Sequence, residues 1–185
     1  MKTSVSLYFA IACLFALPAS ADKPATKTQL KLGQQFFALK FVESDETSGT
    51  VNEYIPEGES LDRWTKMIAI RSQPMGNDPG KAVGALVNAL QTKNPQAKFA
   101  IWKSDDGNRV GVDFITWEGE ITEFNVFIYQ RGADGNGLTS HQYAERAYGD
   151  DMIPFMKGMK ERRAALLDQV LKFDFPAIVT KSVEK

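Results

Sequence analysis

Cysteine and histidine are almost missing from this chain: its 185 residues include one cysteine, Cys13, and one histidine, His141. An ordinary structural zinc site uses about four Cys or His ligands, and a catalytic zinc uses about three protein ligands. Neither can be assembled here without relying almost wholly on carboxylates. The C-x-x-C-H motif of covalently bound haem is also missing. We therefore expect no metal site and no cofactor.

Several catalytic motifs are missing as well. The chain has no G-x-S-x-G nucleophile elbow, no G-x-x-x-x-G-K-[ST] phosphate loop and no G-x-G-x-x-G after a strand. A cysteine nucleophile is excluded if Cys13 is removed, and serine catalysis would depend on His141. These absences favour a protein that binds a ligand or partner without transforming it.

An excess of charge of one sign is missing too, because 22 basic residues stand against 23 acidic ones and the net charge is −1. A nucleic-acid binder needs a concentrated basic field, so we expect no nucleic-acid partner. Beyond the N-terminal region no apolar run reaches the roughly 18 residues of a membrane span. We expect no stable membrane insertion once that region is removed.

Residues 1–21 have the pattern of a signal peptide. A positive start at Lys2 is followed by an apolar stretch over 5–17 and by small residues at 19–21. The stretch continues past Cys13, which favours soluble secretion over lipidation. We expect cleavage before Asp22, loss of the only cysteine, and a periplasmic or secreted protein without a disulfide.

After cleavage, we expect residues 22–33 to be a flexible leader and 34–185 to form a single domain. Alternation of apolar residues predicts a strand over 34–43, which pairs with 50–55 in a hairpin. Ser60 is a plausible helix cap, so we expect a short helix over 60–66 running into a strand over 67–72. A single longer helix is the alternative.

The next helix begins at Pro79, after a cap at Asn77 or Asp78, and ends at Asn94-Pro95. Residues 97–131 read as an antiparallel meander.

Residues 138–148 are ambiguous between strand and helix, and we favour the strand. A long amphipathic helix over 151–173 closes the chain. The fold class expected from this order is α+β: an antiparallel sheet, made of a hairpin and a meander, covered by two or three helices.

The candidate ligand-binding residues are Trp64, His141, Tyr143 and Arg146. In a strand, His141, Tyr143 and Glu145 point to one face and Arg146 to the other. Trp64 is expected mainly to pack under the sheet, with a pocket wall as its functional alternative.

Two oxygen-rich segments, 105–108 and 132–137, contain residues that calcium sites use, but plain turns explain them better. The basic residues Lys157, Lys160, Arg162 and Arg163 on the last helix are interpreted as a solvated face. No residue is assigned a catalytic or metal-binding role.

The stretch from Tyr54 to Met67, with Pro56, Gly58, Glu59 and Trp64, and the segment Ser140-His141-Gln142-Tyr143-Ala144 resemble small exported proteins of unassigned function from Gram-negative bacteria. The order of elements is also similar to that of PsbP-like α+β sandwiches. Those sandwiches are generally accessory or binding modules, so the resemblance implies a non-enzymatic role.

The sequence therefore predicts an exported binding or accessory module, with an unknown small ligand or an envelope protein as its partner. One alternative is a hydrolase or lyase that uses His141 as acid or base. The other is a structural subunit of an envelope assembly, which would show a contiguous exposed apolar patch.

Overall fold

The computed structural model describes residues 28–74, 76–132 and 135–180. The expected signal peptide lies outside these residues. The strands are β1 (Gln29–Leu32), β2 (Gln35–Asp45), β3 (Gly49–Pro56), β4 (Lys66–Gln73), β5 (Lys98–Lys103), β6 (Arg109–Glu118), β7 (Ile121–Arg131) and β8 (Leu138–Tyr148). The helices are α1 (Pro79–Lys93) and α2 (Met152–Leu171), and a 3₁₀ turn, η1 (Gly149–Asp151), precedes α2.

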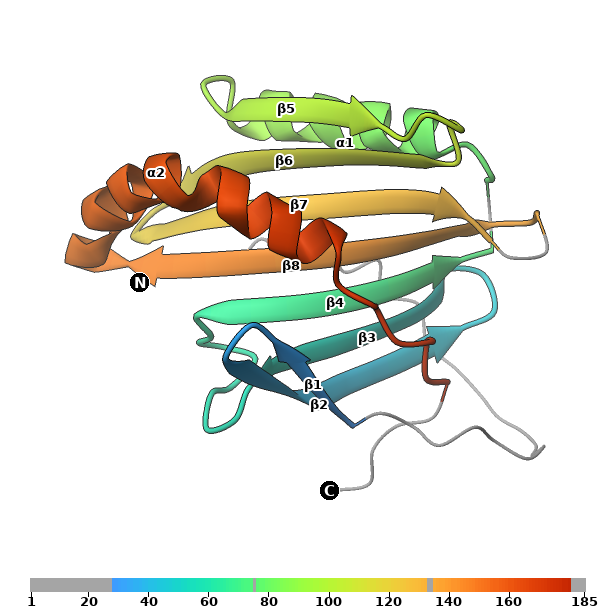
Figure 1. The fold of residues 1–185 in the computed structure, drawn as a ribbon, viewed down its shortest axis with the longest axis horizontal. Coiled ribbons are helices and arrows are strands. Elements are labelled where there is room, and N and C mark those ends of the chain that lie inside the picture. The colour runs from blue at the N-terminus through green and yellow to red at the C-terminus, as the bar shows by residue number, and fades with distance from the viewer. Residues whose placement is uncertain (1–27, 75, 133–134, 181–185) are drawn as a thin grey trace, which may run out of the picture.

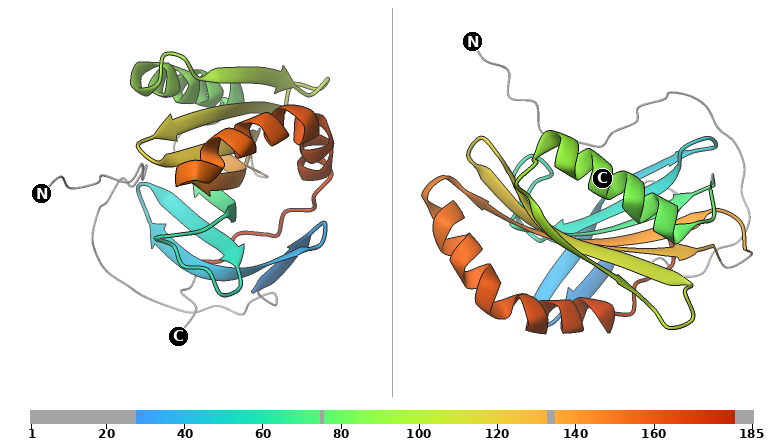
Figure 2. Two further views of the ribbon diagram at one scale, coloured as in Figure 1. Left: turned by 90° about the vertical axis from the view of Figure 1, so that its left-hand side faces the viewer. Right: turned by 90° about the horizontal axis from the view of Figure 1, so that it is seen from above.

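All eight strands belong to one antiparallel sheet, in the order β1-β2-β3-β4-β8-β7-β6-β5 (Figure 1). The last strand, β8, is inserted between β4 and β7, and it joins the N-terminal strands to the meander. The sheet is strongly twisted, and it has α1 on one side and α2 on the other (Figure 2). We call these sides the α1 face and the α2 face.

The larger core lies on the α2 face. Alternate residues of each strand point to this side, and in most strands these residues are apolar and buried. Met159, Leu166 and Val170 of α2 pack onto it. The buried strand residues in this core are Leu30, Leu32, Phe37, Leu39, Tyr54, Ile68, Ile70, Phe124, Val126, Ile128 and Tyr143.

The α1 face has two smaller cores. Val83, Val87 and Leu90 of α1 pack against β6 and β7. The second core forms around Trp64, in the loop between β3 and β4, where Met67 and Ala144 are also buried. A loop therefore covers the part of this face that α1 leaves open.

Residues 172–180, which we call the C-terminal strap, leave α2 and cross the α2 face in an extended form (Figure 1). Phe173 and Phe175 meet edge to face, with ring centroids 4.9 Å apart, and Phe175 stacks on His141 at 4.3 Å. Further along, Asn52 of β3 holds the backbone of Val179 through two hydrogen bonds. The strap thus extends the apolar cover of α2 across the neighbouring strands.

Most of the expected elements are confirmed. The hairpin corresponds to β2 and β3, the meander to β5, β6 and β7, and the ambiguous segment 138–148 is the strand β8. In α1, the Asp78 carboxylate accepts hydrogen bonds from the N–H groups of Gly80 and Lys81, and Pro79 is the first helical residue. The final helix is α2.

The expected short helix over 60–66 is wrong. Ser60 and Arg63 form an isolated β-bridge, and the Glu59 carboxylate accepts hydrogen bonds from the N–H and the hydroxyl of Thr65, both at 2.6 Å. These contacts close a tight loop, so the N–H of Thr65 bonds to a side chain instead of a helical carbonyl. The expected leader also differs, because its residues Gln29–Leu32 form β1.

The expected fold class, an α+β sheet covered by two or three helices, is wrong. The sheet dominates, with 47% of the described residues in strands against 25% in helices, and helices do not cover it. α1 contacts only β6 and β7 strongly, and α2 contacts β7 and β8. The physical reason is that the loop around Trp64 and the C-terminal strap bury apolar surface that we had expected helices to bury.

Candidate functional site

The four candidate residues do not form one surface. Alternation along β8 places His141 and Tyr143 on the α2 face and Arg146 on the α1 face. Trp64 lies on the α1 face beside Arg146. Trp64 and the His141–Tyr143 pair therefore lie on opposite faces of the sheet and cannot bind one ligand together.

Trp64 and Arg146 form a rigid corner. The Arg146 guanidinium stacks on the indole, 3.9 Å from the ring centroid, and Trp64 is 2% exposed. The Tyr148 hydroxyl donates to the Trp64 carbonyl at 2.7 Å and accepts from its backbone N–H at 3.2 Å. The structural role expected for Trp64 is confirmed, since the ring is buried between the loop and the sheet.

Arg146 also belongs to a polar network on the α1 face. Its Nε donates to Glu123 of β7, whose other oxygen accepts from the amide of Asn125 at 2.7 Å. The Asn125 carbonyl in turn accepts from the amide of Gln142 at 2.8 Å. The network thus links β7 and β8 through partly buried groups, each of which has a partner.

The same network continues across β4 to β3. Arg71 donates to the Gln142 carbonyl at 2.8 Å and to Glu53 at 3.4 Å. Burial raises the pKa of Glu53, although Arg71 and Arg146 oppose the shift, and burial lowers the pKa of Arg71. Two arginines face two glutamates, so the network is balanced in charge and holds four strands together.

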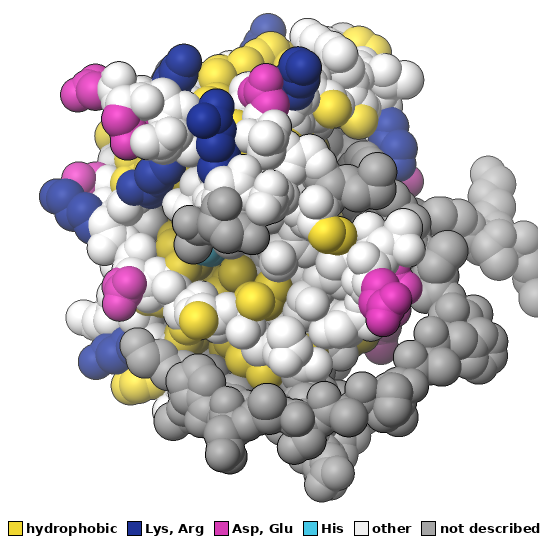
Figure 3. Space-filling model, turned by 90° about the vertical axis from the view of Figure 1, so that its right-hand side faces the viewer, with side chains coloured by type: hydrophobic (Ala, Val, Ile, Leu, Met, Phe, Trp, Pro, Cys, Tyr) yellow, Lys and Arg dark blue, Asp and Glu magenta, His cyan; other side chains and the backbone are white. Residues whose placement is uncertain are grey.

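His141 is half-buried beneath the strap, and Figure 3 shows the only histidine recessed among hydrophobic side chains. Burial lowers its pKa to about 4, and the nearby charge of Arg109 acts in the same direction. Among the described residues, no carboxylate or hydroxyl hydrogen-bonds to the imidazole. His141 is therefore neutral at pH 7 and packs as an aromatic ring.

Tyr143 lies in a different setting on the same face. Its hydroxyl donates to Oε1 of Glu145 at 2.6 Å, and Arg162 of α2 donates to Oε2 of Glu145 at 2.5 Å. Burial, together with the adjacent Glu145, raises the pKa of Tyr143. The hydrogen bond to Glu145 raises the pKa of Arg162. Glu145 is 4% exposed, so this is a carboxylate held inside the protein by two donors.

A cavity of about 530 Å³ opens over this carboxylate, between α2 and the β1–β2 hairpin. We call it the Glu145 pocket. Its polar lining comes from Gln34, Gln35, Lys66, Tyr143, Glu145, Arg162 and Gln169. Gly33 has φ +60°, and a Cβ there would lie 2.4 Å from the Gln169 amide nitrogen. Glycine at this turn therefore lets α2 close one end of the pocket.

Sequence reasoning missed most of this pocket. The solvated face expected for Arg162 and Arg163 is confirmed only in part: their side chains are 43% and 41% exposed, but each guanidinium also bonds to a buried carboxylate. Arg163 forms two hydrogen bonds with Asp113 of β6, at 2.6 and 2.7 Å. The sequence did contain a signal for these ion pairs: Asp113 and Glu145 lie on otherwise apolar strands at positions that point inward, so each carboxylate needs a buried partner.

A second cavity, of about 440 Å³, lies at the opposite end of α2. It is lined by Arg63, Arg146, Tyr148, Asp151 and Phe155, among others. Its arginines already face aromatic rings, because Arg63 lies 4.3 Å from the Tyr148 centroid and Arg146 stacks on Trp64. It therefore has fewer uncommitted polar groups than the Glu145 pocket.

The described residues contain no group of three or more His, Cys, Asp or Glu side chains arranged to hold a metal ion. In the oxygen-rich segment 105–108, Asp106 accepts hydrogen bonds from Ser104 and Asn108, which lower its pKa to about 2. This segment is a turn, and the other oxygen-rich segment includes residues outside the described ones.

Within the described part of the chain, neither helix combines the length and apolar character needed to cross a bilayer.

The chain belongs to an uncharacterised protein family, whose profile matches residues 25–175. The match spans all eight strands and both helices. No curated protein and no solved structure matches the chain. The family therefore defines a class of protein without assigning an activity to it.

Proposed function

We propose that this protein is an exported, non-enzymatic binding module that holds a small hydroxylated carboxylate in the Glu145 pocket. The observation that carries this proposal is the buried Glu145, whose two oxygens are occupied by Tyr143 and Arg162 at the base of an open cavity of about 530 Å³. A cavity of this size suits a small molecule.

The chemistry of the lining selects the ligand class. Glu145 fixes the Arg162 guanidinium through one nitrogen, Nη2, which leaves further N–H donors for a ligand carboxylate. Lys66 adds a second cation to the lining, so cations outnumber the single carboxylate. The carboxamides of Gln34 and Gln169 can donate to and accept from hydroxyl groups. A ligand that carries both a carboxylate and hydroxyl groups can bond to the two cations and to the two carboxamides.

Export is supported by the signal-peptide pattern of residues 1–21 and by the resemblance to exported Gram-negative proteins. A non-enzymatic role is supported by the setting of His141, since a hydrolase or lyase would need a titratable group within hydrogen-bond reach of it. The imidazole instead stacks on Phe175 at 4.3 Å.

Isothermal titration calorimetry tests the proposal with three probes: D-glucuronate, D-gluconate and tartrate, with D-glucose as the uncharged comparison. The wild-type protein is expected to bind at least one of the carboxylates and not glucose. Lys66→Gln should weaken that binding about tenfold, since a hydrogen bond to a charged group of about 1.5 kcal/mol corresponds to roughly a tenfold change in affinity.

The matched control is Lys160→Gln, which removes the same charge from an exposed position of α2 outside the pocket. It should leave the affinity unchanged. Binding of glucose as tight as that of the acids, equal losses in both variants, or no binding of any probe would contradict the proposal.

A further inference from the structure

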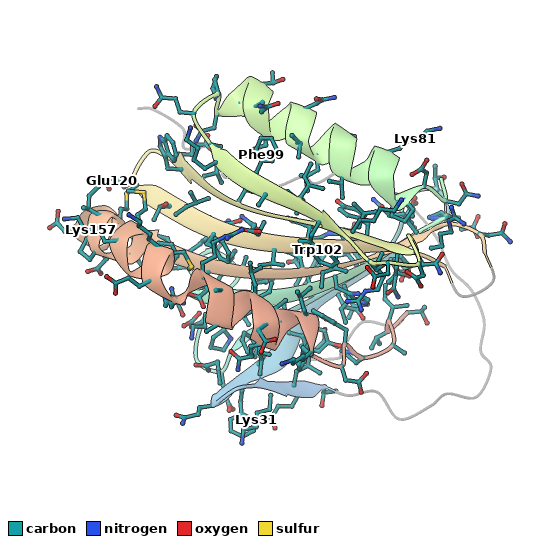
Figure 4. The ribbon with its side chains drawn as sticks, turned by 45° about the horizontal axis from the view of Figure 1, so that its top comes forward. Lys31, Lys81, Phe99, Trp102, Glu120 and Lys157 are labelled. Atoms are coloured by element: carbon teal, nitrogen blue, oxygen red, sulfur yellow. The ribbon has the colours of Figure 1, made fainter. Side chains whose placement is uncertain are left out.

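The outer edge strand β5 is exposed along almost its whole length. Phe99 is 37% exposed and Ile101 is 53% exposed, and both belong to the small set of large hydrophobic side chains at the surface. Figure 4 shows Phe99 and Trp102 on this strand, at the border of the sheet. An exposed apolar edge with unpaired backbone groups is a site where another strand can add.

The hydrogen-bond pattern identifies which backbone groups of β5 have no partner among the residues that the structure describes. The N–H of Ser104 donates to the carbonyl of Arg109 on β6 at 2.9 Å, so Ser104 points towards β6. In an antiparallel pair, alternate residues bond to opposite sides. Lys98, Ala100 and Trp102 therefore bond to β6, and Phe99, Ile101 and Lys103 direct their N–H and C=O groups outward.

The apolar side chains on this edge continue an existing core. Phe99 lies opposite Phe114, and Ile101 lies opposite Val112, and both of these β6 residues are buried under α1. α1 contacts β6 and β7 but extends little over β5. The core of the α1 face therefore ends at two exposed side chains, where a partner could extend it.

We propose that β5 pairs with β5 of a second copy of this chain, antiparallel, across a two-fold axis at Ala100. In this register Phe99 of each copy lies opposite Ile101 of the other on the α1 face. On the other face each Lys98 lies opposite the partner copy's Trp102, and a cation beside an indole is favourable. The two sheets become one continuous sheet.

The pattern of the strand explains why a second copy fits this edge. Strand residues directly opposite each other point to the same face, so a two-fold pairing joins only positions of the same parity. The register that would place Lys98 opposite Lys103 joins opposite parities and is forbidden. With the axis at Ala100, Lys98 lies opposite Trp102 and Lys103 lies opposite Ala97 of the other copy, so the lysines do not face each other directly in this dimer.

Disulfide trapping tests the register in the full chain with Cys13→Ser, which leaves no other cysteine. In Ala100→Cys the two sulfurs would face each other across the axis, at a Cα separation of about 4.5–5.5 Å that suits a disulfide. Mild oxidation should convert most of this variant to a covalent dimer. Lys103→Cys is the matched control, because its two copies would lie about six residues apart along the strands, and it should stay uncrosslinked.

Sedimentation equilibrium at protein concentrations up to about 100 µM provides the second measurement. The wild type should be dimeric, and Ile101→Pro should be monomeric, since proline removes an outward N–H that β6 does not use. Ile101→Lys should give the same loss if the proline variant does not fold. The exposed Phe36 lies near the opposite edge of the sheet, and Phe36→Lys should remain dimeric. A monomeric wild type, equal trapping of both cysteine variants, or no trapping of Ala100→Cys would overturn the proposal.

Discussion

The side-chain amide of Asn52 forms two hydrogen bonds with the backbone of Val179: its Nδ2 donates to the carbonyl at 2.8 Å, and its Oδ1 accepts from the N–H at 2.6 Å. Asn52 is fully buried in β3, 127 positions away in the chain. It offers the strap the same donor and acceptor that a neighbouring strand would offer. Asn52 therefore anchors the end of the strap, which forms no ladder with any strand of the described residues.

Replacing this amide should loosen the strap. Asn52→Leu keeps a similar volume but removes both hydrogen bonds, so the backbone groups of Val179 lose their partners. We expect the free energy of unfolding to fall by about 1–3 kcal/mol in urea denaturation. Backbone amides of the strap should also exchange hydrogen faster, as a mass-spectrometric exchange experiment would report.

Ser44→Ala is the matched control for the strap. It removes a weaker hydrogen bond of 3.4 Å to the Thr180 carbonyl and one of 3.1 Å that Ser44 accepts from the Thr50 hydroxyl, and both are exposed to water. Its effect should be below about 0.5 kcal/mol. If the Ser44 variant loosened the strap as much as the Asn52 variant, the buried amide would not be the anchor.

Acid should destabilise the protein through His141. The pKa of this residue is about 4 in the folded protein, below its ordinary value of 6.5, so the unfolded chain binds more protons between these values. The stabilisation is complete above about pH 6.5 and is lost as the pH falls towards 4. It amounts to at most about 3.5 kcal/mol, because a difference of one in pKa corresponds to about 1.4 kcal/mol.

His141→Phe isolates this contribution, since it keeps a ring to stack on Phe175 and removes the proton site. The difference in unfolding free energy between wild type and variant, measured in urea at several pH values, should shift in favour of the variant as the pH falls from 6.5 to 4. A difference that is constant with pH would contradict the assigned pKa. Carboxylates elsewhere affect both proteins equally and cancel.

Local patterns were enough to predict the strands from β2 onwards and the two long helices, but not β1. Period-two alternation placed β2, and the Asp78–Pro79 pair marked the start of α1, because these signals depend on neighbours in the chain. The alternation in β8 also put His141 and Arg146 on opposite faces. Joining them into one ligand surface ignored that alternation, and the structure separates them.

Contacts between residues far apart in the sequence could not be predicted from local patterns. The helix expected over 60–66 is replaced by a loop because the Glu59 carboxylate bonds to Thr65, and helix caps and loop closures use the same residue types. Glu145 and Arg162 are 17 positions apart on different elements, so no local spacing connects them. The strap has no periodic pattern that sequence reasoning could assign to a strand or helix.

Glycine at position 111 makes room for Trp102. A Cβ built on Gly111 would lie 2.1 Å from Cζ2 and 2.2 Å from Cε2 of the indole, which cannot be accommodated without moving the ring. Gly111→Ala should therefore lower the free energy of unfolding by about 1–3 kcal/mol. Urea denaturation followed by circular dichroism measures this change.

Gly84→Ala is the control for the glycine prediction. Gly84 lies within α1, and a Cβ there would meet no atom within 4 Å. Alanine in a helix is favoured over glycine by about 1 kcal/mol, so this variant should be slightly more stable than wild type. Destabilisation by both substitutions would show that the contact with Trp102 is not the cause.

Asp113 and Arg163 connect β6 to α2, and their burial is unequal. The carboxylate side chain is 3% exposed, whereas the guanidinium side chain is 41% exposed. Arg163→Ala leaves a buried carboxylate without its cation, and Asp113→Asn leaves a cation that water can solvate. An unpaired buried charge destabilises a protein more than an unpaired exposed one. The two substitutions should therefore lower the free energy of unfolding by different amounts, although they break the same pair.

We expect Arg163→Ala to lower the free energy of unfolding by about 2–4 kcal/mol and Asp113→Asn by about 1 kcal/mol. The double variant should be no less stable than Arg163→Ala alone, since it removes the stranded charge together with its partner. Urea denaturation of the three variants at pH 7 measures these differences. If Asp113→Asn were the more damaging single change, the pair would owe its effect to the shape of the bidentate contact and not to the burial of the carboxylate.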